Sequence, residues 1–202
     1  MIKTSSLVSE CDAAGGLGPV FVTVQPHDMI EFINMSSEGF TGRPAAVSSA
    51  EFRAACGQFA TGVTIATVLD AERQPHGLTV SSFVSVSLEP PLVSVCLGHA
   101  VSLIDTFRSA RFFGINILAE EQQALSERFA RKGLDRFEGV GWSLGAHDVP
   151  LLDGVLAAVE CHLDQRISAG DHDIFVGRMV ATRVREGAPL VHFSRAYRKL
   201  QL

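Results

Sequence analysis

The 202-residue sequence lacks an excess of basic residues and lacks any long apolar run. It has 17 Lys and Arg against 22 Asp and Glu, a formal net charge of -5. A general nucleic-acid binder needs a basic face to neutralise phosphates, so the composition argues against that class. No stretch reaches the roughly 18 apolar residues of a membrane-spanning helix. The apolar stretch around residues 19–24 is too short and too late for a secretory signal. We expect a cytoplasmic protein that binds no nucleic acid and no membrane.

Cysteine is also scarce, and no metal-binding spacing is present. The four cysteines, at positions 11, 56, 96 and 161, stand far apart without a C-x-x-C pair. This is typical of a reducing cytosol rather than of a disulfide framework or a zinc site. The seven histidines show neither H-x-x-x-H nor H-E-x-x-H spacing, so we expect no metal site. Gly15-Gly16-Leu17-Gly18 lacks the third glycine of a dinucleotide fingerprint, and no P-loop occurs.

What the chain does have is enough apolar residues for a sizeable core, at 47% hydrophobic and 19% charged. Its length predicts one domain, or one domain plus an appendage. Residues 1–47 are rich in Ser and Gly and show little periodicity, so we expect a flexible N-terminal extension with at most one short strand, at residues 20–24. Organised sequence begins at Ser48, and residues 48–202 form the expected domain.

Hydrophobic periodicity predicts more strands than helices in this domain. Ser48-Ser49-Ala50-Glu51 has the spacing of a capping box and begins a helix with apolar residues through Phe59. Two further helices are expected, one capped by Ser102 and Asp105 and running through residue 110, and one over residues 120–130. The expected strands cover residues 63–69, 77–82, 92–97, 112–118, 155–168, 174–185 and 189–193. Because helices enter singly, the pattern favours an antiparallel β-barrel with peripheral helices over a doubly wound sheet.

One motif matches a serine hydrolase. Gly141-Trp142-Ser143-Leu144-Gly145 has the G-x-S-x-G form of a nucleophile elbow, with Asp164 and His172 downstream. That elbow needs a strand before the serine and a helix after it. Here the motif sits in a glycine-rich connection over residues 131–150, so we interpret it as a coincidence.

Two other segments are candidates for ligand binding. Residues 77–92 carry four serines and a threonine between apolar strands and end in Pro90-Pro91. Hydroxyls and free backbone N–H groups at a strand end hold phosphates or polyols, although an edge strand with a solvated face has the same pattern. Gly170-Asp171-His172-Asp173 is a tight turn between two long strands. A histidine there faces solvent in most proteins, but strand junctions of barrels are also places where ligands bind, and an adjacent carboxylate favours the imidazolium form.

Several motifs, in order along residues 50–200, resemble one known family. They read Phe59-Ala60-Thr61-Gly62-Val63, Gly77-Leu78-Thr79-Val80-Ser81-Ser82-Phe83, Ser85-x-Ser87-x-x-Pro90-Pro91, Phe113-Gly114-Ile115-Asn116-Ile117-Leu118, Phe129-Ala130, Asp135-Arg136-Phe137 and Gly170-Asp171-His172. Together they resemble the flavin reductase-like, FMN-binding split-barrel family, the reductase components of two-component flavin monooxygenases. Residues 1–47 lie outside the resemblance.

The resemblance implies a homodimeric split barrel that binds FMN or FAD and accepts a hydride from NADH or NADPH. It assigns His172 to the nicotinamide, as the catalytic position. The cofactor positions it implies are Thr79, Val80, Ser81, Ser82, Ser85, Ser102, Asn116, Phe129, Ala130, Arg136, Phe137, Asp171 and Tyr197. Among these, the hydroxyls of residues 79, 81 and 82 would contact the ribityl chain and phosphate.

Other implied roles follow the course of the chain. Ser102 would lie at the phosphate, Asn116 on the strand that borders the pocket, and residues 129–130 with 136–137 in a loop over the phosphate end. Tyr197 would lie near the isoalloxazine. Members of the family often carry a second hydroxyl two residues past the Ser102 position, where this chain has Ile104, so one phosphate contact is in doubt.

The chemistry so implied needs no protein nucleophile and no metal, because the two cofactors carry the hydride transfer. The protein must hold two rings face to face at roughly 3–3.5 Å, with His172 orienting the nicotinamide. A partner monooxygenase would take the reduced flavin. Two alternatives stay open: a flavoprotein that retains FMN and acts directly on a small substrate, and a non-enzymatic flavin-binding module. A preference for NADPH would depend on a basic residue such as Arg178 or Arg195.

Overall fold

The computed structural model describes residues 45–133 and 135–200, and the features below belong to them. The short strand expected at residues 20–24 lies outside the described residues, as does nearly all of the extension. The boundary at residues 47 and 48 therefore stays a prediction.

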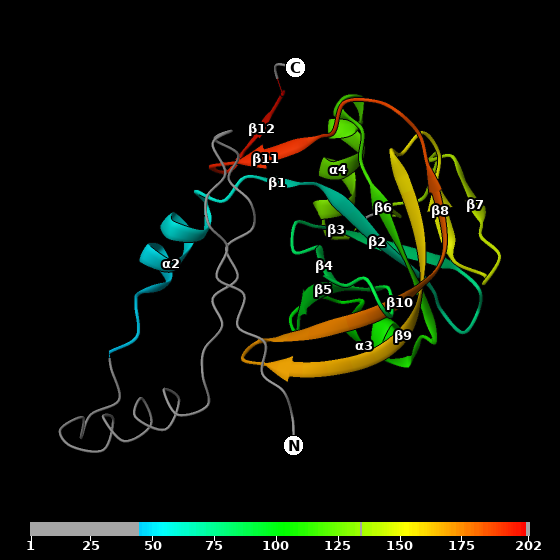
Figure 1. The fold of residues 1–202 in the computed structure, drawn as a ribbon, viewed down its shortest axis with the longest axis horizontal. Helices are drawn as coiled ribbons and strands as arrows, with labels where there is room; N and C mark the ends of the chain where they lie inside the picture. Colours follow the sequence, from blue (N-terminus) through cyan, green and yellow to red (C-terminus); the bar gives the residue numbers. More distant parts are fainter. Residues whose placement is uncertain (1–44, 134, 201–202) are drawn as a thin grey trace, which may run out of the picture. The chain divides into compact units, whose positions relative to one another are not determined.

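One antiparallel sheet of seven strands makes up most of the fold (Figure 1). Its spatial order is β3-β2-β6-β9-β10-β5-β4. The bounds of these strands are β2 Thr64–Leu69, β3 Pro75–Val80, β4 Val84–Ser87, β5 Leu92–Gly98, β6 Phe112–Ile117, β9 Ala157–Ala169 and β10 His172–Val184. The long hairpin β9–β10 has two register shifts, and such bulges bend strands enough to curl a sheet.

Five short strands form two smaller sheets. β1 (Thr61–Gly62), β11 (Val191–Phe193) and β12 (Ala196–Arg198) make one, and β7 (Trp142–Leu144) pairs with β8 (Pro150–Leu152) in the other. The predicted mostly β, antiparallel barrel with peripheral helices is confirmed. β1, β4, β7, β8 and β12 were not predicted, because strands of two to four residues are too short to show a period.

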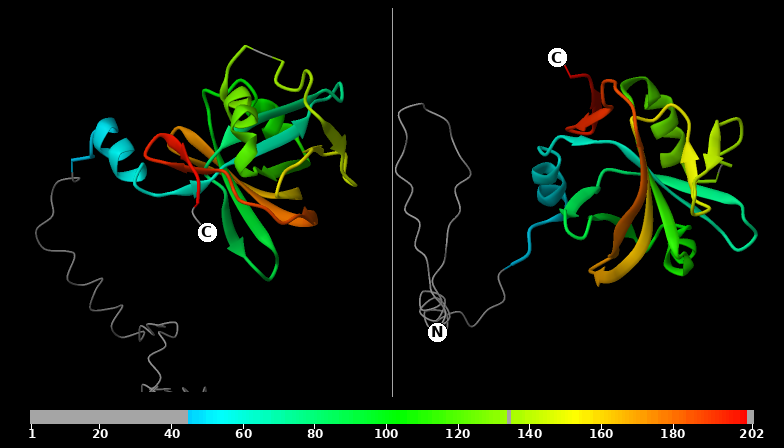
Figure 2. Two further views of the ribbon diagram at one scale, coloured as in Figure 1. Left: turned by 90° about the horizontal axis from the view of Figure 1, so that it is seen from above. Right: turned by 45° about the vertical axis from the view of Figure 1, so that its right-hand side comes forward.

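The helices lie outside the sheet (Figure 2). α2 (Ser49–Cys56) has the predicted capping box, in which Glu51 N–H donates to Ser48 Oγ and Ser48 N–H to the Glu51 carboxylate. α3 is Ile104–Ser109, and the 3₁₀ turn η1 (Glu120–Gln122) leads into α4 (Gln123–Ala130). The predicted cap of α3 by Ser102 is wrong, because Leu103 occupies the N-cap position and no side chain caps it.

Two clusters of buried side chains fill the interior. The larger joins the sheet to α3 and includes Phe107, Phe113 and Phe175. The second lies under α4 and the β7–β8 hairpin, with Phe129 and Phe137 ring to edge at 5.1 Å between centroids. The sheet strand β3 supplies buried residues to the first cluster, and its Gly77 lies against the Phe129 ring of the second. β3 therefore runs between the two cores, and its outer edge is left for the candidate site.

A side-chain bridge links the end of β3 to β5. Ser82 Oγ accepts from Cys96 N–H at 2.9 Å and donates to Cys96 O at 3.1 Å. One hydroxyl thus satisfies both backbone groups of a β5 residue, as a neighbouring strand would. β3 lies at one end of the strand order, and β5 lies next to the other end. The bridge therefore joins the two ends of the sheet and closes it into a barrel, which stays open along the rest of β3.

Candidate functional site

A groove opens where the ends of β3 and β5 and the start of β10 lie close to one another. It has a volume of about 310 Å³ and is lined by Leu78, Thr79, Val80, Ser81, Ser82, Cys96, Leu97, Gly98, Val101 and His172. Two segments singled out in the sequence, the serine-rich strand and the Gly-Asp-His turn, therefore meet here although about 90 residues separate them. The groove combines an apolar wall with hydroxyls and one imidazole.

His172 is positioned by the register of β10. It is the first residue of this strand and pairs with Gly98 at the end of β5. A Cβ at position 98 would lie 3.4 Å from His172 Nε2, in ordinary van der Waals contact, so the imidazole lies directly over the β5 backbone at this position. Asp171 Oδ1 lies 2.7 Å from His172 Nδ1, and this hydrogen bond lowers the pKa of the Asp171 carboxyl. The bond engages Nδ1, and Nε2 has no hydrogen-bond partner among the described residues, so it is the nitrogen available to a ligand.

The turn that carries His172 is held by a buried carboxylate. The Asp173 side chain is 2% exposed, and it accepts from Arg108 Nε at 2.8 Å and lies 2.9 Å from His99 Nε2. The Arg108 guanidinium, followed by the His99 bond, lowers the pKa of Asp173 to about 2. His99 N–H also donates to Asp171 O at 2.8 Å. α3, the end of β5 and the start of β10 are thus fastened together behind the groove.

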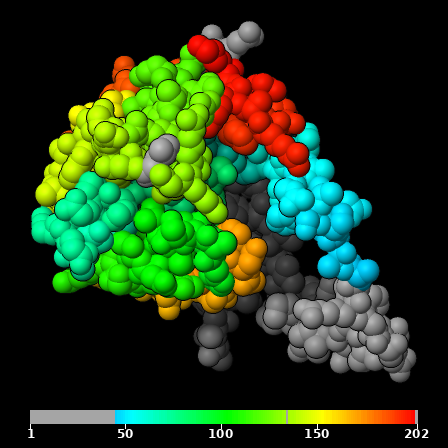
Figure 3. Space-filling view, turned by 180° about the vertical axis from the view of Figure 1, so that it is seen from behind, coloured from blue at the N-terminus to red at the C-terminus, as the bar shows by residue number. Residues whose placement is uncertain are grey.

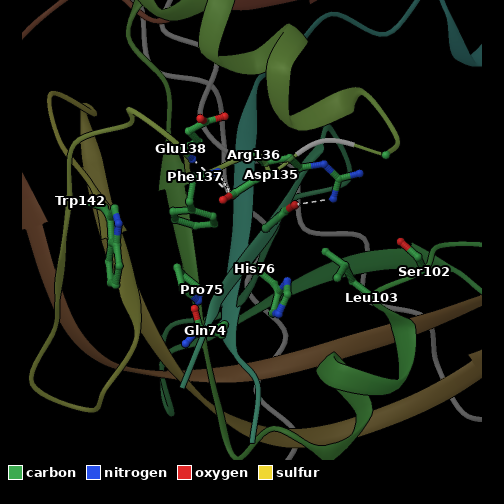
Figure 4. A pocket seen from close by; sticks show the side chains of 12 residues that line it. Gln74, Pro75, His76, Ser102, Leu103, Asp135, Arg136, Phe137, Glu138 and Trp142 are labelled. Atoms are coloured by element: carbon green, nitrogen blue, oxygen red, sulfur yellow. Dashed lines mark hydrogen bonds between the residues drawn. The ribbon is translucent and has the colours of Figure 1, made fainter. Parts of the chain in front are cut away.

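A second hollow, of about 620 Å³, adjoins the groove along β3 (Figure 4). Gly77 lines this hollow, and its neighbour Leu78 lines the groove. In the same way Ser102 lines the hollow, and its neighbour Val101 lines the groove. Its lining residues are Gln74, Pro75, His76, Gly77, Ser102, Leu103, Gly133, Asp135, Arg136, Phe137, Glu138 and Trp142. Figure 4 shows Trp142 at one end and Ser102 and Leu103 at the other, with His76 between them.

Arg136 anchors the loop of the second hollow to the edge of β3. Its Nη1 donates to Gly77 O at 2.8 Å, and its Nε and Nη2 donate to Arg131 O. Three of the five guanidinium N–H groups are thus used within the chain. Partial burial lowers the pKa of Arg136. Arg128 holds the same loop by donating to the carbonyls of residues 135 and 136, so the loop is positioned before any ligand arrives.

Eight of the fourteen predicted site residues line one of the two cavities. His172, Thr79, Val80, Ser81 and Ser82 line the groove, and Ser102, Arg136 and Phe137 line the second hollow. Asp171 lies beside them through its bond to His172. Two of the hydroxyls have partners within the chain, because Thr79 Oγ1 donates to Ser126 O at 2.6 Å and Ser82 bridges to Cys96. Ser81 and Ser102 are exposed.

The remaining predicted positions line neither cavity. Asn116 is fully buried, donates to Ile65 O and Thr67 Oγ1, and accepts from Leu152 N–H, so its amide serves the core instead of a ligand. Phe129 is also fully buried. The Tyr197 hydroxyl lies 2.9 Å from Ser126 Oγ, which ties β12 to α4. Ala130 ends α4, and Ser85 lies on β4.

The hydrolase motif has a packing role. Ser143 lies exposed in β7, a strand of a two-stranded hairpin with no helix after it. A Cβ at Gly141 would lie 2.6 Å from Oδ2 of the exposed Asp153, and one at Gly145 would overlap the carboxylate of the buried Glu160. Gly145 thus makes room for a buried side chain, and the glycine there has a packing explanation. In the described ranges there is no group of three His, Cys, Asp or Glu side chains suited to a metal.

Sequence reasoning missed Gly98, His76 and Trp142. Gly98 has no motif, and its value depends on facing His172 across two strands. His76 lies 2.7 Å from Asp70 Oδ2 and faces the second hollow. Trp142 was considered only as part of the hydrolase motif, although a lone tryptophan in a polar connection was a signal. Within residues 45–133 and 135–200, the structure has no helix long and apolar enough to span a bilayer.

Known proteins carry the same domain. The family model described as "Flavin reductase like domain" matches residues 56–201. An FMN reductase (NADH) of Agrobacterium fabrum is 40% identical over 162 residues, which cover 80% of this chain and 91% of that protein. The reductase component of a flavin-dependent trigonelline monooxygenase of Acinetobacter baylyi is 43% identical over 129 residues, or 64% of this chain. This chain spans only 42% of that component's length.

Solved structures agree. An NADH:FAD oxidoreductase of Streptomyces globisporus, in complex with NAD and FAD fragments, superposes with a TM-score of 0.71 at 31% identity, covering 78% of this chain and 98% of that one. A sequence identity of 31% together with this superposition indicates more than a shared fold. The family model also spans well over half of the sequence. This chain belongs to the flavin reductase-like family of split-barrel proteins.

Proposed function

We propose that the protein is an NAD(P)H:flavin oxidoreductase, which passes a hydride from a nicotinamide nucleotide to FMN or FAD and supplies the reduced flavin to a partner monooxygenase. The observation that carries the proposal is the groove in which the serine-rich end of β3 faces His172. The family membership and the names of the relatives support it.

The groove and the adjoining hollow have chemistry that suits a flavin. The apolar wall of the groove, formed by residues such as Leu97 and Val101, suits the face of a ring system. The exposed hydroxyls of Ser81 in the groove and of Ser102 in the second hollow suit a polyol phosphate. Position 98 has no side chain, which keeps the space beside the imidazole open. When bound, a flavin supplies an electrophilic ring nitrogen that accepts the hydride.

His172 orients the nicotinamide in this proposal. Asp171 holds Nδ1, so Nε2 faces the groove and donates or accepts one hydrogen bond there. The network around Asp173 keeps the turn in place, and the side chain needs little reorganisation when the nucleotide binds. Neither a nucleophile nor a strong base is needed, since the residues have only to align two rings and exclude water from between them.

The test is the oxidation of NADH and of NADPH followed at 340 nm, with and without added FMN, FAD or riboflavin. We expect turnover that saturates with free flavin, because a reductase of this kind treats flavin as a substrate. Flavin that stays with the protein through a desalting column, together with turnover of a small substrate, would favour the FMN-retaining alternative. Flavin binding without any oxidation of pyridine nucleotide would refute the reductase.

We also propose that the protein is a homodimer joined through α2. Within residues 45–133 and 135–200 this helix has no buried residue. The side chains of Phe52, in the helix, and of Phe59, just after it, are 59% and 76% exposed. Figure 3 shows α2 at the edge of the molecule, next to the C-terminal strands. An eight-residue helix is not stable alone in water, and exposed aromatic residues mark contact surfaces. A second copy of the chain is the partner that accounts for both features.

The cytoplasm is the location that the same proposal requires. The three described cysteines, Cys56, Cys96 and Cys161, are free thiols, which suits a reducing compartment.

A further inference from the structure

His172 lies at the exposed end of a hairpin, where packing alone does not fix a side chain. It is the first residue of β10, and only Gly170 and Asp171 separate it from the last residue of β9. Its side chain is 48% exposed, and that of Asp171, to which it bonds, is 94% exposed. A ring that aligns a nicotinamide must keep one position, so this turn needs hydrogen bonds from another element.

His99 supplies such bonds on both sides of His172. Because His172 pairs with Gly98, the last residue of β5, the next residue along the chain lies beside the turn. The His99 backbone N–H donates to Asp171 O at 2.8 Å, and its Nε2 lies 2.9 Å from Oδ1 of Asp173. One residue thus bonds to both chain neighbours of the histidine that orients the nicotinamide in the proposed function.

The bond to Asp173 has a defined direction and a defined geometry. This carboxyl is buried, and hydrogen bonds from Arg108 and then from His99 lower its pKa to about 2. It is therefore ionised at neutral pH and can only accept, so Nε2 of His99 carries the donated proton. Arg108 Nε donates to the second carboxylate oxygen, Oδ2, at 2.8 Å. With both oxygens bonded, the carboxylate holds the His99 ring in one orientation.

We propose that His99 is a positioning residue for hydride transfer, because it bonds to both chain neighbours of His172 and so keeps the His172 imidazole where it meets the nicotinamide. The inference rests on the proposed reductase function and adds a second histidine to it. His99 lies outside the linings of both cavities, so it acts through His172 and has no contact with the ligand.

A double-mutant cycle tests whether His99 acts through His172. Stopped flow follows the reduction of FMN by NADH in the full-length wild type, in His99→Ala, in His172→Ala and in the double variant. We expect His99→Ala alone to slow reduction about tenfold, the cost of one hydrogen bond to a charged group. In the His172→Ala background the same change should have little further effect. Equal slowing in both backgrounds would overturn the proposal.

A conservative variant separates positioning from a general loss of structure. His99→Gln keeps a side-chain N–H donor for Asp173, and the backbone N–H at position 99 is unchanged, so we expect most of the reduction rate to return. The Kd for FMN should stay at the wild-type value in both His99 variants. His162→Ala, on β9 but outside both cavity linings, is the control. A loss of FMN affinity as large as the loss of rate, with His99→Gln no better than His99→Ala, would indicate a structural role and would overturn the proposal.

Hydrogen exchange tests the same contact without catalysis. In flavin-free, full-length protein, His99→Ala should raise the exchange rate of the backbone amides of residues 170–174 about tenfold, because exchange follows the free energy of local opening. Residues 157–159 and 182–184, at the other end of the hairpin, should keep their wild-type rates.

The two assays keep the two proposals apart. Unchanged exchange in residues 170–174 of His99→Ala would overturn the role of His99, even where the wild type reduces FMN at full rate. A wild type that oxidises no NADH with any flavin would instead refute the reductase function, and with it any role in hydride transfer, whatever the exchange of the turn shows.

Discussion

At the scale of single residues, the site depends on groups that neighbouring atoms hold in place. His172 has one ring nitrogen bonded to Asp171 and the other beside Gly98. Asp173, next in the chain, points the other way and is buried between Arg108 and His99. Neighbouring side chains of a strand point to opposite faces. His172 therefore lines the groove, while Asp173 is buried behind it and holds the turn in place.

His172→Ala should slow hydride transfer more than it weakens flavin binding. Losing one orienting hydrogen bond to the nicotinamide should cost about ten- to a hundredfold in rate. Stopped-flow reduction of bound FMN measures the rate, and a flavin titration measures the affinity. His162→Ala, on β9 of the same hairpin but outside both cavity linings, is the matched control. An unchanged reduction rate in His172→Ala would exclude the proposed role.

Asp173→Asn should change how stability depends on pH. The carboxyl has a pKa lowered to about 2 in the folded protein, from an ordinary value of 3.8. A lowered pKa means that the ionised group stabilises the fold above pH 4 and that this contribution is lost as pH falls towards 2. The Tm difference between wild type and Asp173→Asn should therefore be largest near neutral pH and shrink below pH 4.

Asp105→Asn is the control for that experiment, because Asp105 also pairs with Arg108 but is 87% exposed. Exposed ion pairs contribute little, so its Tm profile should follow that of the wild type. A Tm difference for Asp173→Asn that stays constant from pH 7 to pH 2 would contradict the assigned role of the carboxylate.

At the scale of elements, β3 and the barrel closure decide where the site lies. β3 is the edge strand of the large sheet, paired only with β2 within it. Its other edge receives Arg136 at Gly77 and, just past its end, the Ser82 bridge to β5. Side chains rather than a neighbouring strand thus complete this edge, and the space they leave is the groove and the second hollow.

Asn116→Ala should destabilise the fold without changing the ligand site. The amide of Asn116 joins β6 to β2 and to Leu152 of β8. Its removal leaves the buried Leu152 N–H without this acceptor, so the free energy of unfolding should fall by about 2–4 kcal/mol. Urea unfolding measures this change.

Gln123→Ala is the matched control for an amide, because Gln123 is exposed and bonds to Glu127 on the same helix. We expect its effect on stability to be below about 0.5 kcal/mol. A large loss of flavin affinity in folded Asn116→Ala protein would instead show that Asn116 contributes to cofactor binding, as the family resemblance implied.

At the scale of the whole molecule, the domain leaves apolar surface on elements away from the groove. α2 carries it most clearly, because the side chains of the helix are exposed along its whole length while its capping box specifies a real helix. Figure 2 shows this helix apart from the sheet. A helix that is well defined locally but unburied among the described residues supports the proposed dimer.

The double variant Phe52→Ser, Phe59→Ser should convert a dimer into monomers. Light scattering after gel filtration should give twice the chain mass for wild type and a single chain mass for the variant, because burial of two aromatic side chains per copy supplies much of the contact energy. Val184→Ser, which changes an apolar residue that is 77% exposed at the far end of β10, should remain dimeric. A monomeric wild type would refute the proposal.

Local patterns predicted the long elements and the chemical class of the site. The capping box at Ser48, the alternation in β9 and the serine-rich end of β3 each express a property of neighbouring residues, and such properties can be read along the chain. The family motifs added His172, the serines and the loop at Arg136, and the structure brings these together around one edge strand.

Only the tertiary structure decided which of these residues remain free for a ligand. Asn116, Thr79 and Ser82 look like ligand-binding residues in one dimension, but their polar atoms have partners 14 to 51 positions away. Gly98 shows no local signal, and it matters because strand pairing brings it beside His172. Hydrogen-bond partners and cavity walls arise from pairing between distant segments, whereas sequence patterns report on local geometry and burial.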